Sequence, residues 1–136
     1  MNRMEEEPKK YDLSGYVIGA AMKVHSALGP GFLESVYQNA LIWELRKNGF
    51  KAEAGRAITV LFDGQIVGAF KADPLVNDSL IVELKAAQML VKTHDVQVVN
   101  YLVATGIDEG LLLNFGGERL EYKKKFRMPK HEQVSF

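Results

Sequence analysis

Residues 72–85 read ADPLVNDSLIVELK, with two short apolar runs flanking the turn-forming residues 77–79. A turn centred on Asp78 predicts an antiparallel hairpin whose paired residue numbers sum to 156, so Asp73 would lie opposite Glu83. A slip of one residue would instead place Asp73 among apolar side chains. Pro74 can also introduce a bulge that shifts the pairing, so the interpretation depends on the register.

In this register two carboxylates face each other. Directly opposed Cβ atoms lie about 4.5–5.5 Å apart, and like charges there destabilise a sheet unless a positive group lies between them. Because side chains alternate along a strand, Glu83 and Lys85 share one face, while Val82 and Leu84 form an apolar face on the other side. Carboxylates that bind a hard cation through oxygen, with an ammonium beside them, are suited to phosphodiester hydrolysis.

Outward from this hairpin, apolar spacing and turn residues predict the other elements. Two helices are expected first, over 13–28 with a stop at Gly29-Pro30-Gly31, and over about 32–47 with a stop at Asn48-Gly49. Strands at 58–62, 65–76 and 80–85, with a hairpin turn at Asp63-Gly64, predict a three-stranded antiparallel meander. A helix capped at residues 93–95 and ending at Gly106, then a hairpin around Gly116-Gly117, complete an α/β (α+β) order with a mixed sheet.

The composition is that of one soluble globular domain: 136 residues, 47% of them hydrophobic and 25% charged. Seventeen basic and seventeen acidic residues balance, so the overall charge indicates no polyanion-coating protein. The absence of cysteine excludes disulfides, Cys-ligated zinc and a thiol nucleophile. We expect a polar lead-in over 1–10, one domain over 11–127 and a tail over 128–136.

No segment resembles a signal peptide, and the longest uncharged runs are shorter than the roughly 18–20 apolar residues that a membrane span needs. We therefore expect a cytoplasmic protein with no membrane association.

Several motifs together resemble a known family. Asp73, followed by Glu83-Leu84-Lys85 at a strand end, is similar to the signature of the PD-(D/E)xK nuclease superfamily. The segment 31–37, GFLESVY, resembles the G-x-x-E-x-x-Y motif of the GxxExxY family within it. Residues 97–102 and 110–116 resemble further blocks of that family, whereas Pro74 departs from the aliphatic residue usual after the aspartate.

The resemblance implies a restriction-endonuclease-like core, in which helices flank the meander. It implies that Asp73, Glu83 and Glu34 are catalytic ligands of Mg²⁺ or Mn²⁺, and that Lys85 orients or deprotonates the attacking water. It also implies a cleft lined by Gln97 and Tyr101, which lie four residues apart on one helical face. Tyr37 is a further candidate for substrate binding, as a core residue with its hydroxyl at the edge of the cleft.

Each candidate also has a purely structural interpretation. With Gly31 as N-cap, Glu34 would be the third helical residue and would bond back to the cap amide. Asp73 could cap a turn, and Glu83 and Lys85 could be an ion pair on an edge strand. Gln97 and Tyr101 could be the polar margin of a packed helix. The histidines show no spacing typical of metal ligands.

The segment 118–130 has six basic residues against two glutamates, a net charge of +4. Lys123, Lys124 and Lys125 in it are candidates for binding a nucleic-acid backbone, and the alternative is a solvated strand and tail. Phe126 and Phe136 could bury against a second copy, so homodimerisation stays open. We therefore expect a Mg²⁺-dependent nuclease acting on nucleic acid, with DNA as the expected substrate. The alternative is a catalytically silent binding or assembly module with the same fold.

Overall fold

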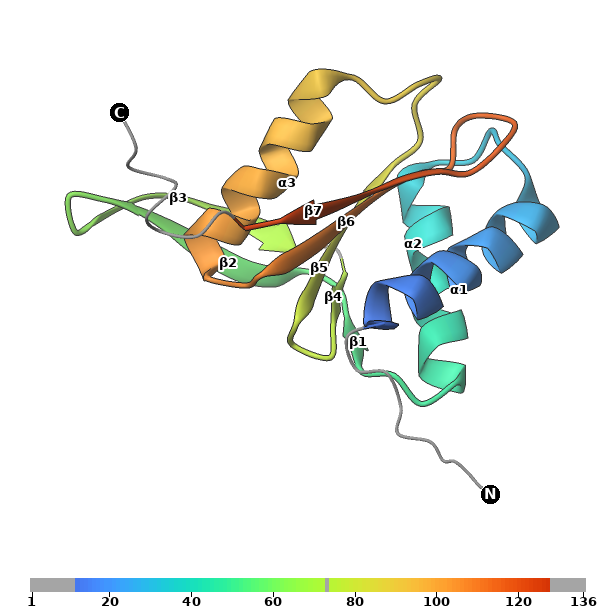
Figure 1. Ribbon diagram of the computed structural model, residues 1–136, viewed down its shortest axis with the longest axis horizontal. Helices are drawn as coiled ribbons and strands as arrows, with labels where there is room; N and C mark the ends of the chain where they lie inside the picture. The colour runs from blue at the N-terminus through green and yellow to red at the C-terminus, as the bar shows by residue number, and fades with distance from the viewer. Residues whose placement is uncertain (1–11, 73, 128–136) are drawn as a thin grey trace.

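The computed structural model describes residues 12–72 and 74–127 (Figure 1). Three helices and seven strands lie in these residues. In chain order they are α1 (Leu13–Leu28), α2 (Glu34–Lys47), β1 (Ala52–Glu53), β2 (Arg56–Phe62), β3 (Gln65–Ala72), β4 (Leu75–Val76), β5 (Leu80–Lys85), α3 (Lys92–Thr105), β6 (Glu109–Asn114) and β7 (Glu121–Phe126).

Five strands form a mixed sheet in the order β1-β4-β5-β6-β7, and β2 and β3 form a separate two-stranded ribbon. Within the sheet β5 and β6 run parallel, and the other neighbours are antiparallel. The parallel pair is joined by α3, as a crossover connection requires. The predicted α/β architecture, a mixed sheet flanked by helices and consistent with a restriction-endonuclease-like fold, is confirmed.

The main core lies between the sheet and the pair α1 and α2. Apolar residues three or four apart on each helix, such as Val17 and Ala21 on α1 or Leu41 and Leu45 on α2, are buried there. Val82 and Leu84 of β5 are buried in the same cluster. A smaller cluster forms on the opposite face, where α3 covers the sheet.

The helix ends follow the predicted stops more closely than the predicted starts. α1 ends before Gly29, and α3 ends before Gly106, its C-cap, whose φ of 74° is left-handed. α2 begins at Glu34 with Leu33 as N-cap, so Glu34 is the first helical residue and not the third. The interpretation in which Glu34 closes a capping box on Gly31 is therefore wrong.

The meander differs from its prediction in one respect. The hairpin turn at Asp63-Gly64 forms, with positive φ at both residues, but the return strand stops at Ala72 and a separate strand, β4, begins at Leu75. Pro74 lies between them and has no amide hydrogen to donate to a continuing ladder. The strands therefore divide between the ribbon and the main sheet, where the two-residue strand β1, which was not predicted, pairs with β4.

In the part of the chain that the structure describes, no helix combines the length and apolar character needed to cross a membrane.

Candidate active site

The hairpin of β4 and β5 has the predicted register. Leu75 pairs with Ile81 and Val76 with Leu80, so paired numbers sum to 156. The Val82 amide also donates a hydrogen bond of 2.9 Å to the Pro74 carbonyl oxygen, which carries the same register one residue further. Asp73 itself lies outside the described residues, so its position opposite Glu83 stays a prediction.

Glu83 and Lys85 lie at the C-terminal end of β5, on the face opposite the main core. Their side chains are 14% and 20% exposed, and the Lys85 Nζ atom lies 3.4 Å from Glu83 Oε2. Val82 and Leu84, which alternate with them, are buried beneath α1 and α2. The strand thus holds a carboxylate and an ammonium side by side in a partly dehydrated position.

Tyr101 of α3 lies close enough to Glu83 to respond to its charge. Burial raises the pKa of Tyr101, the negative charge of Glu83 raises it further, and a hydrogen bond with Gln97 lowers it. The net effect is an increase above the ordinary tyrosine pKa. Tyr101 is therefore a neighbour of Gln97, on the same helix α3, and of Glu83, which lies on β5.

Phe70 of β3 is a neighbour that the sequence analysis missed. Its ring stacks on the ring of Tyr101, with centroids 3.8 Å apart and planes 12° apart. The contact docks the base of the ribbon onto α3 and fixes the Tyr101 ring. The sequence carried no signal for it, because Phe70 lies opposite Ile58 only through an irregularity in the ribbon between Val60 and Leu61.

Tyr37 lies in the main core, as expected from the sequence. Its side chain is fully buried. Its hydroxyl donates to the Gly29 carbonyl oxygen at 2.6 Å and accepts from the Phe32 amide at 3.1 Å. Tyr37 therefore holds the loop that leads into α2, and so positions Glu34, which is exposed in the first turn.

Phe115 connects the first turns of α2 with the end of β5. The Tyr37 ring stacks on Phe115 with centroids 4.7 Å apart. The Phe115 amide in turn donates to the Lys85 carbonyl oxygen at 2.9 Å. These contacts connect the helix that carries Glu34 with the strand that carries Glu83 and Lys85.

Asn114 holds the segment that follows β5, and this role was also missed. Its Oδ1 accepts from the Ala87 amide at 2.9 Å, and its Nδ2 donates to the Ala87 carbonyl oxygen at 2.9 Å and to Glu121 Oε1 at 2.7 Å. Gly116 packs so tightly that a Cβ there would overlap the backbone of Ala87. Asn114 is fully buried, and its place at the end of the apolar run 111–113 was the sequence signal that could have indicated this clamp.

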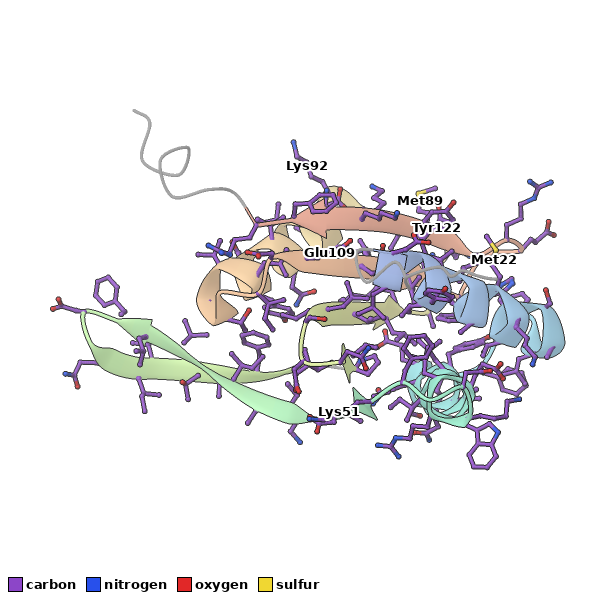
Figure 2. The ribbon with its side chains drawn as sticks, turned by 60° about the horizontal axis from the view of Figure 1, so that its bottom comes forward. Met22, Lys51, Met89, Lys92, Glu109 and Tyr122 are labelled. Carbon is purple, nitrogen blue, oxygen red and sulfur yellow. The ribbon has the colours of Figure 1, made fainter. Side chains whose placement is uncertain are left out.

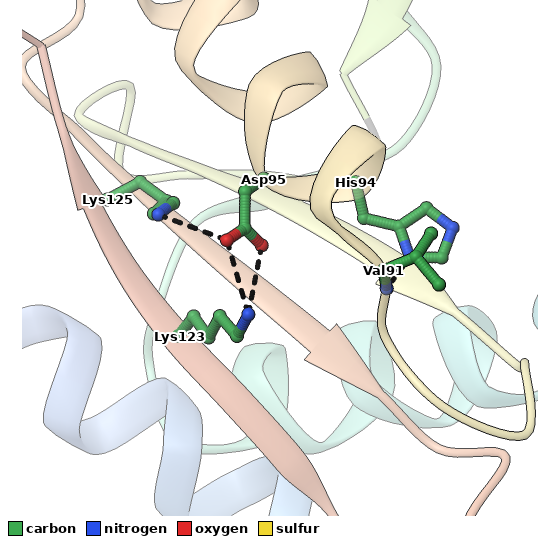
Figure 3. Close-up of polar contacts among 5 residues, drawn as sticks. All are labelled: Val91, His94, Asp95, Lys123 and Lys125. Carbon is green, nitrogen blue, oxygen red and sulfur yellow. Dashed lines mark hydrogen bonds and ion pairs between the residues drawn. The ribbon is translucent and has the colours of Figure 1, made fainter.

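The three lysines of β7 do not share one face. Lys123 and Lys125 both pair with Asp95 of α3, with Nζ–Oδ2 distances of 3.2 and 3.4 Å (Figure 3). Burial raises the pKa of Asp95, but the hydrogen bond from Lys123 and the positive charges of both lysines lower it overall. Lys124 lies between them and points to the opposite face, because side chains alternate along a strand.

Only part of the predicted metal-ligand set can be located. Within residues 12–72 and 74–127, no three His, Asp or Glu side chains gather closely enough to hold a metal ion. Glu83 offers a carboxylate at the end of β5, and Asp73, the partner expected from the sequence, lies outside the described residues. Oxygen donors of this kind suit Mg²⁺ or Mn²⁺.

A family model for the PD-(D/E)XK nuclease superfamily matches residues 11–126 of the chain. Among solved structures, the chain is similar to the crystal structure of SSO0001, with a TM-score of 0.56 and 16% sequence identity. The likeness covers 92% of this chain and 64% of that one, and it concerns the fold. No curated protein matches the chain.

Proposed function

The chain belongs to the PD-(D/E)XK nuclease superfamily, and on that premise we propose that it is a metal-dependent nuclease that hydrolyses phosphodiester bonds in DNA. One observation carries the proposal. Glu83 and Lys85 lie side by side on the partly buried face of β5, next to Tyr101 of α3, in a hairpin that has the register expected from the sequence. Fold alone would not distinguish a nuclease from a binding module.

Asp73 and Glu83 would hold the divalent cation, and Glu34 would approach it from the start of α2. Their carboxylate oxygens match the preference of Mg²⁺ and Mn²⁺ for hard ligands. When bound, the cation would supply Lewis-acid polarisation of the phosphodiester and lower the pKa of a water molecule.

The remaining residues have roles that follow from their chemistry. The Lys85 ammonium, held by Glu83, would orient the attacking water and offset the negative charge that builds on the phosphate oxygens. Gln97 and the Tyr101 hydroxyl would contact the substrate backbone. Phe70 would keep the Tyr101 ring in place by stacking on it.

We further propose that the chain is a member of the GxxExxY family. The motif has a physical basis here: Tyr37 fastens the loop that contains Gly31, which has a φ of 111°, and Glu34 lies between them at the helix start. The tyrosine therefore acts as a positioning residue for the glutamate.

The experiment compares the wild-type protein with the Lys85→Ala variant in cleavage assays with Mg²⁺ or Mn²⁺. We expect cleavage to fall by about 10²–10⁴-fold, the usual contribution of a positioned proton-transfer group. The loss of stability should be about 1 kcal/mol, because only one strand-end ion pair is removed. Lys51→Ala is the matched control, since Lys51 also pairs with carboxylates, those of Asp78 and Glu53, and should keep full activity.

Undiminished metal-dependent cleavage by purified Lys85→Ala would refute the role of Lys85. The substrates should include single-stranded, duplex and branched DNA, and RNA. A wild-type protein that cleaves none of them with either metal would favour the catalytically silent binding module instead.

A further inference from the structure

The ribbon of β2 and β3 extends beyond the rest of the molecule (Figure 2). Its base is fixed, because Ile58 packs in the smaller core and Phe70 stacks on Tyr101. Its outer half carries four large apolar side chains that are 60–72% exposed: Leu61, Phe62, Ile66 and Val67. A cluster of exposed apolar residues on a projecting element is typical of an interaction surface.

The outer part of the ribbon, residues 57–70, lacks the basic residues that a nucleic-acid backbone would need, and the ribbon's Arg56 and Lys71 lie at its base. Between residues 57 and 70 the only charged residue is Asp63, at the tip. Binding to phosphates depends on lysine and arginine, and this stretch contains neither. The surface therefore suits an apolar protein partner.

The backbone of the ribbon indicates how that partner would bind. In the described part of the chain, β2 and β3 pair with each other and with no other strand, so each has an outer edge. Proteins commonly protect such edges with lysine, proline or an inward-facing charge, and the interior of this ribbon has none of these. Another strand could continue the ladder along either edge.

We propose that the partner is a second copy of this chain, and that the two ribbons pair edge to edge and antiparallel about a two-fold axis. In such a contact the tip of each ribbon lies beside the base of the other. Asp63 at the tip would then meet the partner's Lys71, which is exposed at the base. The ribbon is thus complementary to itself in charge and in apolar character, as a two-fold interface requires.

The first test is sedimentation velocity of the full chain, and it does not depend on nuclease activity. The wild-type protein of 15.2 kDa should sediment as a dimer of about twice that mass. Ile66→Glu should raise the dimer dissociation constant by about 30-fold or more, the scale of an interface hot spot. Trp43→Glu is the matched control, because Trp43 on α2 and Ile66 are both 70% exposed, and it should leave the dimer unchanged.

A charge test separates a second copy from an unrelated partner. Lys71→Glu should weaken the dimer by placing two carboxylates side by side. Adding Asp63→Asn should recover part of the affinity, because it removes that repulsion while asparagine tolerates the left-handed conformation that Asp63 adopts, with a φ of 56°. No recovery in the double variant would contradict the antiparallel arrangement.

Cross-linking tests the geometry directly, because the chain has no cysteine of its own. A mixture of Gln65→Cys and Lys71→Cys chains should be joined by a short thiol cross-linker, tip to base. Cross-links within Gln65→Cys chains alone would indicate a tip-to-tip contact and overturn the arrangement. A wild-type protein that stays monomeric at high micromolar concentration would overturn the proposal as a whole, whatever its nuclease activity.

Discussion

Tyr101 reports on the electrostatics of the candidate site, because a neighbouring charge changes its pKa. Burial is the main cause of the raised pKa, and the carboxylate of Glu83 adds to it by making a second negative charge unfavourable. The hydrogen bond with Gln97 acts in the opposite direction. Removing the charge of Glu83 without changing its size should therefore shift the titration of one tyrosine.

We predict that Glu83→Gln lowers the pKa of Tyr101 toward the ordinary tyrosine value. The measurement is a pH titration of the tyrosine ring carbons by NMR, with the Tyr101 signal assigned by its loss in Tyr101→Phe. Glu44→Gln is the control, because Glu44 pairs with Lys23 and Lys47 and is not among the groups that shift Tyr101. An unchanged Tyr101 titration in Glu83→Gln would show that the two side chains are not neighbours.

At the scale of residues, the sequence predicted which side chains of β5 share a face, but not the aromatic contacts around them. The period of two is enough to place Glu83 with Lys85 and opposite Val82. The stack of Phe70 on Tyr101 depends on how the ribbon docks on α3, which no local pattern encodes. Tyr37 was predicted to be a core residue, but its stack on Phe115, far away in the sequence, was not.

At the scale of elements, the segment after β5 is held by the end of β6. The Asn114 side chain forms hydrogen bonds with both the amide and the carbonyl of Ala87. Gly116, which has no Cβ, allows its own backbone to approach that of Ala87. Lys85 is two residues before Ala87, so this clamp fixes the strand end that carries the candidate catalytic groups.

Gly116→Ala should destabilise the protein by about 2–3 kcal/mol, because the new Cβ overlaps the Ala87 backbone and the clamp must open. Gly19→Ala, in the middle of α1 with open space around the new Cβ, should instead stabilise it by about 0.5–1 kcal/mol. Urea denaturation measures both changes. Equal effects of the two substitutions would contradict the tight packing at Gly116.

The lysines of β7 give a second prediction for an element. Lys123 pairs with Leu112 of β6, and Leu112 pairs with Glu83 of β5. Directly paired residues lie on the same face of a sheet, so Lys123, and Lys125 two residues later, lie on the face of the candidate site. If that face binds DNA, replacing both by glutamine should weaken binding regardless of sequence. It should also reduce the slope of log K against log[salt] by about 0.9 for each phosphate that the protein no longer neutralises.

Lys124→Gln is the matched control on the opposite face and should leave the slope unchanged. Fluorescence anisotropy of labelled duplex DNA over a range of salt concentrations measures both quantities. If Lys124→Gln weakens binding as much as the double substitution does, the assignment of the face is wrong.

At the scale of the whole molecule, the order of elements and the mixed sheet could be predicted because turns and apolar periods are local. The end of α1 at Gly29 and the turn at Asp63-Gly64 are examples. The division of β3 from β4, and the projection of the ribbon away from the sheet, were not predicted. Both features depend on which strands meet in space. Pro74 indicated a possible irregularity in the strand, but not that the chain would pass there from the ribbon to the main sheet.

The central claim is that Asp73 and Glu83 together bind a divalent cation, and calorimetric titration of the full-length protein with Mn²⁺ tests it most directly. The wild-type protein should bind the metal, and Asp73→Asn and Glu83→Gln should each abolish or greatly weaken that binding, because each removes one oxygen ligand and its charge. Glu44→Gln, which changes a carboxylate already paired with two lysines, should bind as the wild type does. Wild-type affinity in Asp73→Asn and Glu83→Gln, or no binding by the wild-type protein, would contradict the account.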